Sequence, residues 1–402
     1  MRQRVAFCHI HKTAGTTIST YLRSNYPPEE VFPATGLQEV TQKQIDQIND
    51  YALIAGHFPL SFLRSFLASD WKIVTVLRDP VKRFVSHLAF DHQLRHGGSP
   101  HVPPLDIAGL EDEVAAFSNF QTRFLGGWLS RDEWRYLVAS RKAITYHLSG
   151  AWHQGTIESA SRVAMEELQQ IDWILDDNRV LQGLQRVALD CHFWPFEYLP
   201  HSNKGDYLGV DETPGGEALR AIAPAHNLID VELYEAARNL VVQDLMAHEI
   251  IRLNANWMAR YTPSRSCVVA ADHGFMGTGW TGPYHSLDGS AFRWSDSSLV
   301  QDLYFPLTIA GHHEFELSIF LPDCRPGFSI SIEMAGQRCE PAVEQADGDQ
   351  MTFIFRPDFV IGDVGRLQRV RILADCRSQV RPPGGLPNAG FISNGAIARL
   401  LG

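Results

Sequence analysis

Short apolar runs alternate with helically spaced apolar residues along the first part of the chain. Three of the runs predict buried strands, at residues 4–10, 51–55 and 72–77. The last is rich in the β-branched residues of strands that are covered on both faces. Amphipathic stretches at 18–23 and 81–94 predict helices after the first and third strands. Because strand, turn and helix in succession favour right-handed crossovers, we expect an α/β fold with a mainly parallel sheet flanked by helices.

Helical spacing recurs at 112–138, 157–168 and 231–251. The pattern changes after residue 260. Beyond a polar linker, short segments alternate apolar and polar residues and are separated by turn clusters. Evenly spaced strands with almost no helical signal indicate an all-β sandwich. The predicted strands lie at 315–320, 328–332, 351–355 and 370–373.

The length supports two domains, because 402 residues exceed what one compact domain usually holds. We expect the α/β domain at 1–260, the linker at 261–266 and the β-sandwich domain at 267–402.

Composition and charge narrow the function. The formal net charge of −11 argues against a dedicated binder of nucleic acid or anionic membrane, which needs a broad basic surface. A small anion in a local basic pocket is compatible with it. No apolar run approaches the ~18 residues of a membrane helix, and the chain starts without the apolar core of a signal peptide. We therefore expect a cytoplasmic protein. Six cysteines without Cys-x-x-Cys spacing indicate no common zinc or redox motif.

A bend after the first predicted strand carries the residue types of an anion site. The helix that follows offers unpaired N–H groups and the positive end of its dipole. Lys12 adds a mobile full charge, Gly15 permits a close backbone approach, and threonines supply hydroxyls. An ordinary strand–helix turn capped by threonine is the alternative for this segment. The predicted cradle consists of Lys12, Thr13, Ala14, Gly15, Thr16 and Thr17.

The cradle differs from the nucleotide-triphosphate loop. In Gly-x-x-x-x-Gly-Lys-[Ser/Thr] the lysine follows its glycine, and a hydroxyl holds magnesium. Here Lys12 precedes Gly15. We therefore expect a P-loop-like sheet and a site whose chemistry needs no metal. The same residue order disfavours a kinase.

A second anion site is predicted at the end of the strand at 72–77. Arg78 stands at its carboxyl end, and Ser86 follows two turns into the next helix. Ligands of open parallel sheets bind at the carboxyl ends of the strands. A lysine–threonine site and an arginine–serine site on one sheet suit a ligand with two separated anionic groups.

The two segments together resemble the cofactor signatures of sulfotransferases that use 3′-phosphoadenosine-5′-phosphosulfate (PAPS). The forms His-Ile-His-Lys-Thr-Ala-Gly-Thr-Thr and Arg-Asp-Pro-Val-Lys-Arg-Phe-Val-Ser-His look like those of the carbohydrate branch, which includes the heparan sulfate 2-O- and 6-O-sulfotransferases. The resemblance covers residues 4–255. It implies that the cradle binds the 5′-phosphosulfate and that Arg78 and Ser86 bind the 3′-phosphate. We interpret Asp79 and Arg83 as helix-start structure.

Sulfuryl transfer needs a base for the proton of the acceptor hydroxyl, and histidine is the natural base near neutral pH. His57 follows a glycine just past the second predicted strand, and this Gly-His resembles the position of the catalytic histidine in the glycan enzymes. Lys12 would stabilise the charge that builds on the bridging oxygen. Bonding of His57 to a loop carbonyl is the alternative. His9 and His11 are rival bases, and with His57 they could form a zinc site.

Weaker signals add candidate contacts. Arg123 lies in a segment that resembles a recurring helix of these enzymes, where it could face the cleft or be solvated or salt-bridged. Lys204 resembles a phosphate contact in the late loop over the nucleotide. Trp280 and Trp294 could stack on sugar rings, and the alternative for both is the core of the sandwich.

Two functions from different classes of protein remain. The first is a bacterial-type, PAPS-dependent O-sulfotransferase that acts on a saccharide hydroxyl by metal-independent in-line displacement. Its expected acceptor pocket is the pair of loops at 97–104 and 201–216. The second is a carbohydrate-binding or scaffolding protein with a degenerate nucleotide-binding domain. Both imply a saccharide partner, and neither implies nucleic acid.

Overall fold

The computed structural model describes residues 2–95, 109–141, 156–196, 214–241, 254–271, 276–278, 280–285, 291–295, 301–320, 329–347, 350–362, 364–374 and 392–401. The chain folds into two compact units. The first contains 1–15, 29–183 and 205–243, and the second contains 16–28, 184–204 and 244–402. Two segments from the first part of the chain, 16–28 and 184–204, belong to the second unit, and the predicted domain bounds stay a prediction.

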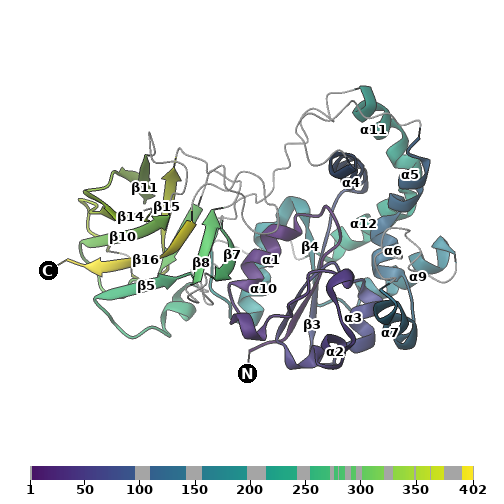
Figure 1. Cartoon of the computed structure of the whole chain (residues 1–402), viewed down its shortest axis with the longest axis horizontal. Helices are drawn as coiled ribbons and strands as arrows, with labels where there is room; N and C mark the ends of the chain where they lie inside the picture. The colour runs from purple at the N-terminus through teal and green to yellow at the C-terminus, as the bar shows by residue number, and fades with distance from the viewer. Residues whose placement is uncertain are drawn as a thin grey trace. The chain divides into compact units, whose positions relative to one another are not determined.

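A four-stranded parallel sheet forms the centre of the first unit (Figure 1). Its order is β2-β1-β3-β4, and each neighbouring pair of strands is parallel. Three strands overlap the three predicted runs, so the predicted parallel sheet is confirmed. These three are buried apart from Lys72, as expected for strands covered on both faces. The strands are β1 (Val5–Cys8), β2 (Leu53–Gly56), β3 (Lys72–Leu77) and β4 (Trp173–Asp176).

Helices pack around this sheet through one apolar core. Ala6 and Ile54 of the strands belong to the same buried cluster as Phe62, Phe124 and Trp134 of the helices. Figure 1 shows α3, α6, α7 and α9 grouped beside the sheet. The helices of this unit are α2 (Gln42–Asp46), α3 (Leu60–Phe66), α4 (Pro80–Arg95), α5 (Glu111–Phe117), α6 (Phe120–Gly126), α7 (Arg131–Ala139), α9 (Ile157–Leu168), α11 (Pro214–His226) and α12 (Leu228–Leu240).

The helical stretch predicted at 112–138 is three helices. α5 ends at Phe117, and Asn119 adopts the left-handed conformation, with φ of 45°, just before α6. Asparagine is one of the residues that tolerate this conformation. α7 starts after Ser130, which forms a capping box with Glu133. Apolar spacing runs through both breaks, and for this reason the pattern shows one helix.

The helix predicted at 231–251 is shorter in the structure. α12 ends at Leu240, and Val241 is its extended C-cap. Residues 242–253 lie outside the described part of the chain. No helix among the described residues is both long and apolar enough to cross a membrane.

The second unit contains antiparallel sheets, as predicted for the C-terminal part. One sheet has the order β13-β14-β10-β16-β8-β7, with β5 paired to β16, and the other has the order β12-β11-β15-β9-β6. The strands are β5 (Ser266–Ala270), β6 (Gly277–Thr278), β7 (Trp280–His285), β8 (Ala291–Ser295), β9 (Gln301–Phe305), β10 (His313–Phe320), β11 (Ile330–Met334), β12 (Gln337–Cys339), β13 (Val343–Asp347), β14 (Gln350–Phe355), β15 (Gln368–Ala374) and β16 (Ile392–Leu400).

Aromatic contacts join helical segments of the first 200 residues to these strands. The helices are α1 (Gly15–Arg23) and α10 (Val180–Cys191). The Tyr21 hydroxyl donates to the carbonyl of Trp194 over 2.8 Å, and the Trp194 indole N–H donates to Ser24 over 2.9 Å. The rings of Trp194 and Tyr304 of β9 are 5.3 Å apart. The segment after α10 therefore lies between α1 and β9 in the second unit.

Candidate active site

The carboxyl ends of the four parallel strands meet at one edge of the sheet. β1 leads into the bend that carries Lys12, β2 leads to His57, and β3 leads to Arg78. β4, which the sequence pattern did not reveal, leads to Asp177 in a short 3₁₀ helix at Asp177–Arg179. The structure thus places Lys12, His57 and Arg78 at the same edge.

The bend after β1 has the backbone of an anion site. Lys12 and Ala14 have positive φ values of 67° and 63°, and Thr13 between them does not. Alternation of this kind aims successive N–H groups into one concavity, which binds anions. Left-handed conformations cost about 1 kcal/mol each for residues with a Cβ. The bend therefore holds strained backbone at the position where the sequence predicts an anion.

Two side chains, those of Thr13 and His9, contact the backbone of the bend. Thr13 is buried and donates its hydroxyl to the Ile10 carbonyl over 2.7 Å, so its remaining donor for an anion is its backbone N–H. The ring of His9 packs so closely on Gly15 that a Cβ at Gly15 would collide with it. The packing of the His9 ring therefore requires glycine at this position. The predicted contacts Thr16 and Thr17 lie in the first turn of α1.

Lys12 carries the positive charge of the bend. Its Nζ lies 4.2 Å from the ring centroid of Phe90. Burial, together with the charge of Arg78, lowers the pKa of Lys12 to about 8. The ammonium group is therefore protonated at neutral pH and close to its titration range.

Arg78 links the bend to the ends of β3 and β4. Its Nη1 donates to the Lys12 carbonyl over 2.9 Å, and its Nε lies 3.2 Å from Oδ2 of Asp177. Gln121 fixes its backbone, because the amide of Gln121 accepts from the Arg78 N–H and donates to the Arg78 carbonyl, both over 2.9 Å. Burial raises the pKa of Asp177 to about 6, and Arg78 opposes this rise. The guanidinium is thus held across the edge where the second anion is predicted.

The other residues of the second motif divide into structural ones and one candidate contact. Asp79 accepts the N–H of Lys82 over 2.9 Å at the start of α4, as expected for helix-start structure. Arg83 is fully buried and donates to the Phe117 carbonyl over 2.6 Å. Ser86 lies in α4 and is partly exposed, and its contact with the 3′-phosphate stays a prediction.

His57 is held in one tautomer. Its Nδ1 lies 2.9 Å from the His9 carbonyl oxygen, and a carbonyl only accepts, so Nδ1 carries the proton and Nε2 carries the lone pair. Burial lowers the pKa of His57 to about 4, against the His9 carbonyl, which raises it. The backbone N–H of His57 donates to the Thr35 carbonyl over 2.7 Å. The bond to a loop carbonyl that the sequence offered as the alternative is thus made by Nδ1. It leaves the lone pair of Nε2 in the neutral ring to act as a base.

The three histidines at this edge are stacked. The ring centroids of His9 and His57 are 4.0 Å apart, and those of His11 and His57 are 3.7 Å apart. Stacked rings direct their nitrogens outward in nearly parallel planes, which does not converge lone pairs on one metal ion. Within the described part of the chain, no three histidine, cysteine or acidic side chains are grouped to hold a metal.

The side chain of Arg123 is largely taken up by carbonyls of its own neighbourhood, and its contact with the acceptor stays a prediction. Its Nη2 donates to the carbonyls of Ala116 and Ser118, the latter over 2.6 Å, and only 8% of the residue is exposed. These carbonyls end α5, where a helix leaves its last carbonyls without partners. Sequence reasoning named this segment but missed Gln121, the side chain of the segment that bonds to the Arg78 backbone.

A buried carboxylate supports Gln121 in turn. Asp230 of α12 accepts the N–H groups of Gln121 and Thr122 over 3.0 and 2.7 Å, at the start of α6. This bond fixes the first turn of α6, and with it the amide that holds Arg78. No sequence signal pointed to Asp230, because it is distant in the chain.

Trp280 is a core residue, so the proposed stacking on a sugar does not fit it. Only 1% of Trp280 is exposed, and its indole N–H donates to the Asp302 carbonyl over 3.3 Å. Trp294 lies in β8, but its side chain is outside the described residues. Lys204 and both predicted acceptor loops, apart from 214–216, also lie outside them.

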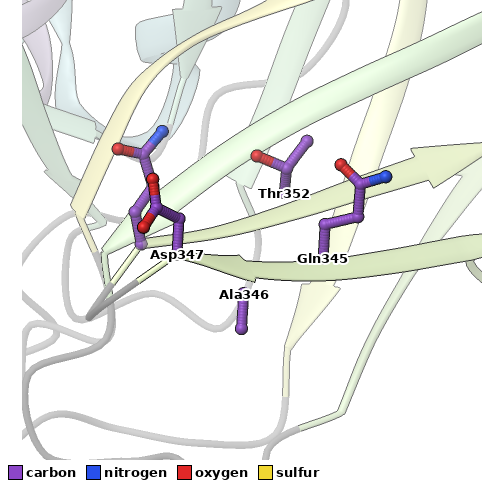
Figure 2. Close-up of a pocket in the computed structure, with 5 residues that line it drawn as sticks. Gln345, Ala346, Asp347 and Thr352 are labelled. Carbon is purple, nitrogen blue, oxygen red and sulfur yellow. The ribbon is translucent and has the colours of Figure 1, made fainter.

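A pocket of the second unit lies on the hairpin of β13 and β14 (Figure 2). Gln345 and Asp347 point to the same side as Thr352, and Ala346 points away from them. Gln350 also lines it. The pocket contains none of the site residues predicted from the sequence.

Residues 3–140 match the family model of the sulfotransferase domain. This match supports sulfuryl transfer as the general activity. It includes the bend after β1, His57 and Arg78. No curated protein matches the chain.

Three solved structures have a weak likeness to the chain. The C-terminal CBM6 of LamC, a marine laminarinase from Zobellia galactanivorans, is 9% identical, with 33% of this chain and 98% of that chain covered and a TM-score of 0.21. An exo-β-1,3-galactanase from Phanerochaete chrysosporium is 13% identical, with 34% and 30% covered and a TM-score of 0.22. A family GH115 4-O-methyl-α-glucuronidase is 9% identical, with 80% and 40% covered and a TM-score of 0.22. Scores this low establish no shared fold.

Proposed function

We propose that the chain is an O-sulfotransferase that moves a sulfuryl group from PAPS to a saccharide hydroxyl. The observation that carries the proposal is the strained bend at Lys12 and Ala14, tied by the Lys12 carbonyl to the guanidinium of Arg78. The family match over residues 3–140 supports the class of reaction. The saccharide rests on the resemblance of both motifs to the carbohydrate sulfotransferases.

The residues at the sheet edge fit a doubly anionic nucleotide. The N–H groups of the bend and the Lys12 ammonium would hold the 5′-phosphosulfate. Arg78 has five N–H donors in a planar fork, which suits a phosphate, and Ser86 would add a hydroxyl. When bound, PAPS supplies the sulfuryl group and leaves as adenosine 3′,5′-bisphosphate.

The chain's own residues account for the proton and the charge of the transfer. As the new S–O bond forms, Nε2 of His57 takes the proton of the acceptor hydroxyl, because its Nδ1 proton is fixed on the His9 carbonyl. The Lys12 ammonium stabilises the negative charge that remains on the departing phosphate oxygen. The roles of His57 and Lys12 need no metal ion.

The acceptor class is tested with PAPS that carries a labelled sulfuryl group and a panel of glycans. We expect label on at least one saccharide. Label on none of the glycans, combined with normal nucleotide binding, would contradict the saccharide acceptor and leave the sulfotransferase class in place.

Nucleotide binding is tested by thermal unfolding. Adenosine 3′,5′-bisphosphate at 100 times its Kd should stabilise the chain by about 2.7 kcal/mol and raise the melting temperature. Adenosine 5′-phosphate should bind about 10–100-fold more weakly, because it lacks the charge-assisted contacts of Arg78. In the variant Arg78→Ala the preference for the 3′-phosphate should fall to the small part that the Ser86 hydroxyl supplies.

Arg162→Ala is the matched control, since Arg162 is an arginine of α9 whose side chain is 68% exposed and pairs with Glu166 of the same helix. It should keep the preference for the 3′-phosphate. No melting shift with either nucleotide in the wild-type chain would favour the carbohydrate-binding or scaffolding function instead.

A further inference from the structure

Six aromatic rings form one column through the candidate active site. In order they belong to Phe7, His9, His57, His11, His87 and Phe117. Neighbouring centroids are 5.2, 4.0, 3.7, 5.5 and 3.9 Å apart, with interplanar angles of 9°, 29°, 14°, 7° and 19°. The rings come from β1, the two bends after β1 and β2, α4 and α5, so the column joins separate elements of the first unit.

His57 occupies the tightest part of this column. His9 covers one face of its ring and His11 covers the other, both within 4.0 Å between centroids. Rotation of an imidazole about its last side-chain bond would sweep the ring through both neighbours. Since Nδ1 is also bonded to the His9 carbonyl, one ring orientation satisfies all three contacts.

Other groups hold His9 on one side of His57 and the residues His87 and Phe117 on the other. His9 lies against the backbone of Gly15, where even a Cβ would not fit. At the other end, Nη1 of Arg83 lies 3.1 Å from Nδ1 of His87. A guanidinium only donates, so this nitrogen of His87 accepts. Arg83 also donates to the backbone carbonyl of Phe117, and one buried side chain thus bonds to the residues of the last two rings.

The edges of His11 and His87 meet one further ring. Phe120 of α6 lies 5.7 Å from His11 and 5.1 Å from His87, and it is nearly perpendicular to both. Edge-to-face contacts at these distances are favourable. His11 is thus positioned by Phe120 and by its stacking, although it belongs to the bend.

Stacking suits a role in which the faces of His9 and His11 act and their nitrogens do not take the proton. Burial, with His57 and Lys12 nearby, lowers the pKa of His9 well below its usual range, so its ring is neutral. A neutral aromatic face attracts a cation. When His57 takes a proton, its imidazolium lies between this neutral face of His9 and the ring of His11.

We propose that His9 and His11 are positioning residues that clamp the ring of His57, so that Nδ1 stays on the His9 carbonyl and Nε2 stays turned to the acceptor. This proposal rests on the proposed function, in which His57 is the base. It assigns to both histidines of the His-Ile-His motif a role other than that of the base.

The test compares two variants of His11. His11→Ala removes one wall of the clamp and should lower kcat by about 10–100-fold, with an unchanged Kd for adenosine 3′,5′-bisphosphate. His11→Phe restores a flat face without a nitrogen, and it should regain most of the lost kcat. An equally inactive His11→Phe would overturn the proposal, as would a fully active His11→Ala.

A spectroscopic readout keeps the proposal separate from the sulfotransferase activity. Nitrogen-15 spectra should show His57 with the proton on Nδ1 in the wild-type chain and in His11→Phe, and a mixture of both tautomers in His11→Ala. His9→Phe should likewise preserve the flat wall and the backbone carbonyl of residue 9. If no acceptor is sulfated but the spectra change as described, the proposed function fails while the clamp stands. Identical spectra in the three chains would overturn the clamp.

Discussion

Replacement of His57 by alanine is expected to lower the kcat of sulfuryl transfer by about 10²–10⁴-fold, which is the usual contribution of a positioned base. The ring contacts His9 and His11 and does not contribute a charge at neutral pH, since burial lowers its pKa to about 4. The affinity for adenosine 3′,5′-bisphosphate should therefore survive. Transfer of the label to the glycan acceptor gives kcat, and calorimetry gives the affinity.

His312→Ala is the matched control for this prediction. His312 is an exposed histidine next to β10, outside the candidate site, and its removal should leave transfer unchanged. Transfer at the wild-type rate in His57→Ala would show that another group takes the proton. If the variant loses both its nucleotide affinity and its transfer activity, the substitution disturbs the bend through His9.

Replacement of Lys12 by glutamine is expected to lower kcat by about 10²–10³-fold, the usual loss when one group that stabilises transition-state charge is removed.

The kcat/KM of the wild-type chain should fall as the pH rises through about 8, because burial lowers the pKa of Lys12 to that value and the neutral amine stabilises no charge. As the pH falls through about 4, His57 gains a proton and kcat/KM falls again. A profile of kcat/KM against pH that extends below pH 4 and above pH 8 measures both declines.

Lys12→Arg separates the charge from the rest of the side chain. Arginine stays protonated throughout this range, so the alkaline decline near pH 8 should disappear while the acidic one remains. Lys43→Gln, at an exposed lysine of α2, is the control and should keep both limbs. An alkaline limb near pH 8 that persists in Lys12→Arg would assign this titration to a different group.

The parts of the fold that the sequence predicted are those with strong local signals. The three predicted strands are short, almost wholly buried runs. Each is followed by a residue whose side chain can bind an anion or take a proton. Their meeting at one edge follows from parallel pairing alone, and the structure places Lys12, His57 and Arg78 there. β4 has only two buried residues out of four, so it carries no comparable apolar signal.

The contacts that tune the site were beyond sequence reasoning because they join distant segments. Asp177 meets Arg78 through the pairing of β3 with β4, and Asp230 holds Gln121 from another helix. Arg123 and Trp280 show the converse problem. Their side chains are of types that bind ligands, and only the surrounding carbonyls and burial assign them to the interior.

The placement of α1 and α10 has a consequence for how such chains can be recombined. The bend at Lys12 leads directly into α1, and α1 shares a unit with Trp194 and Tyr304. If the residues after 260 are replaced by those of a homologue, the new strands would therefore have to pack on aromatic residues of α1 and the segment after α10 that matched the original strands. Exchange between relatives should succeed only when both sides of that surface are inherited together.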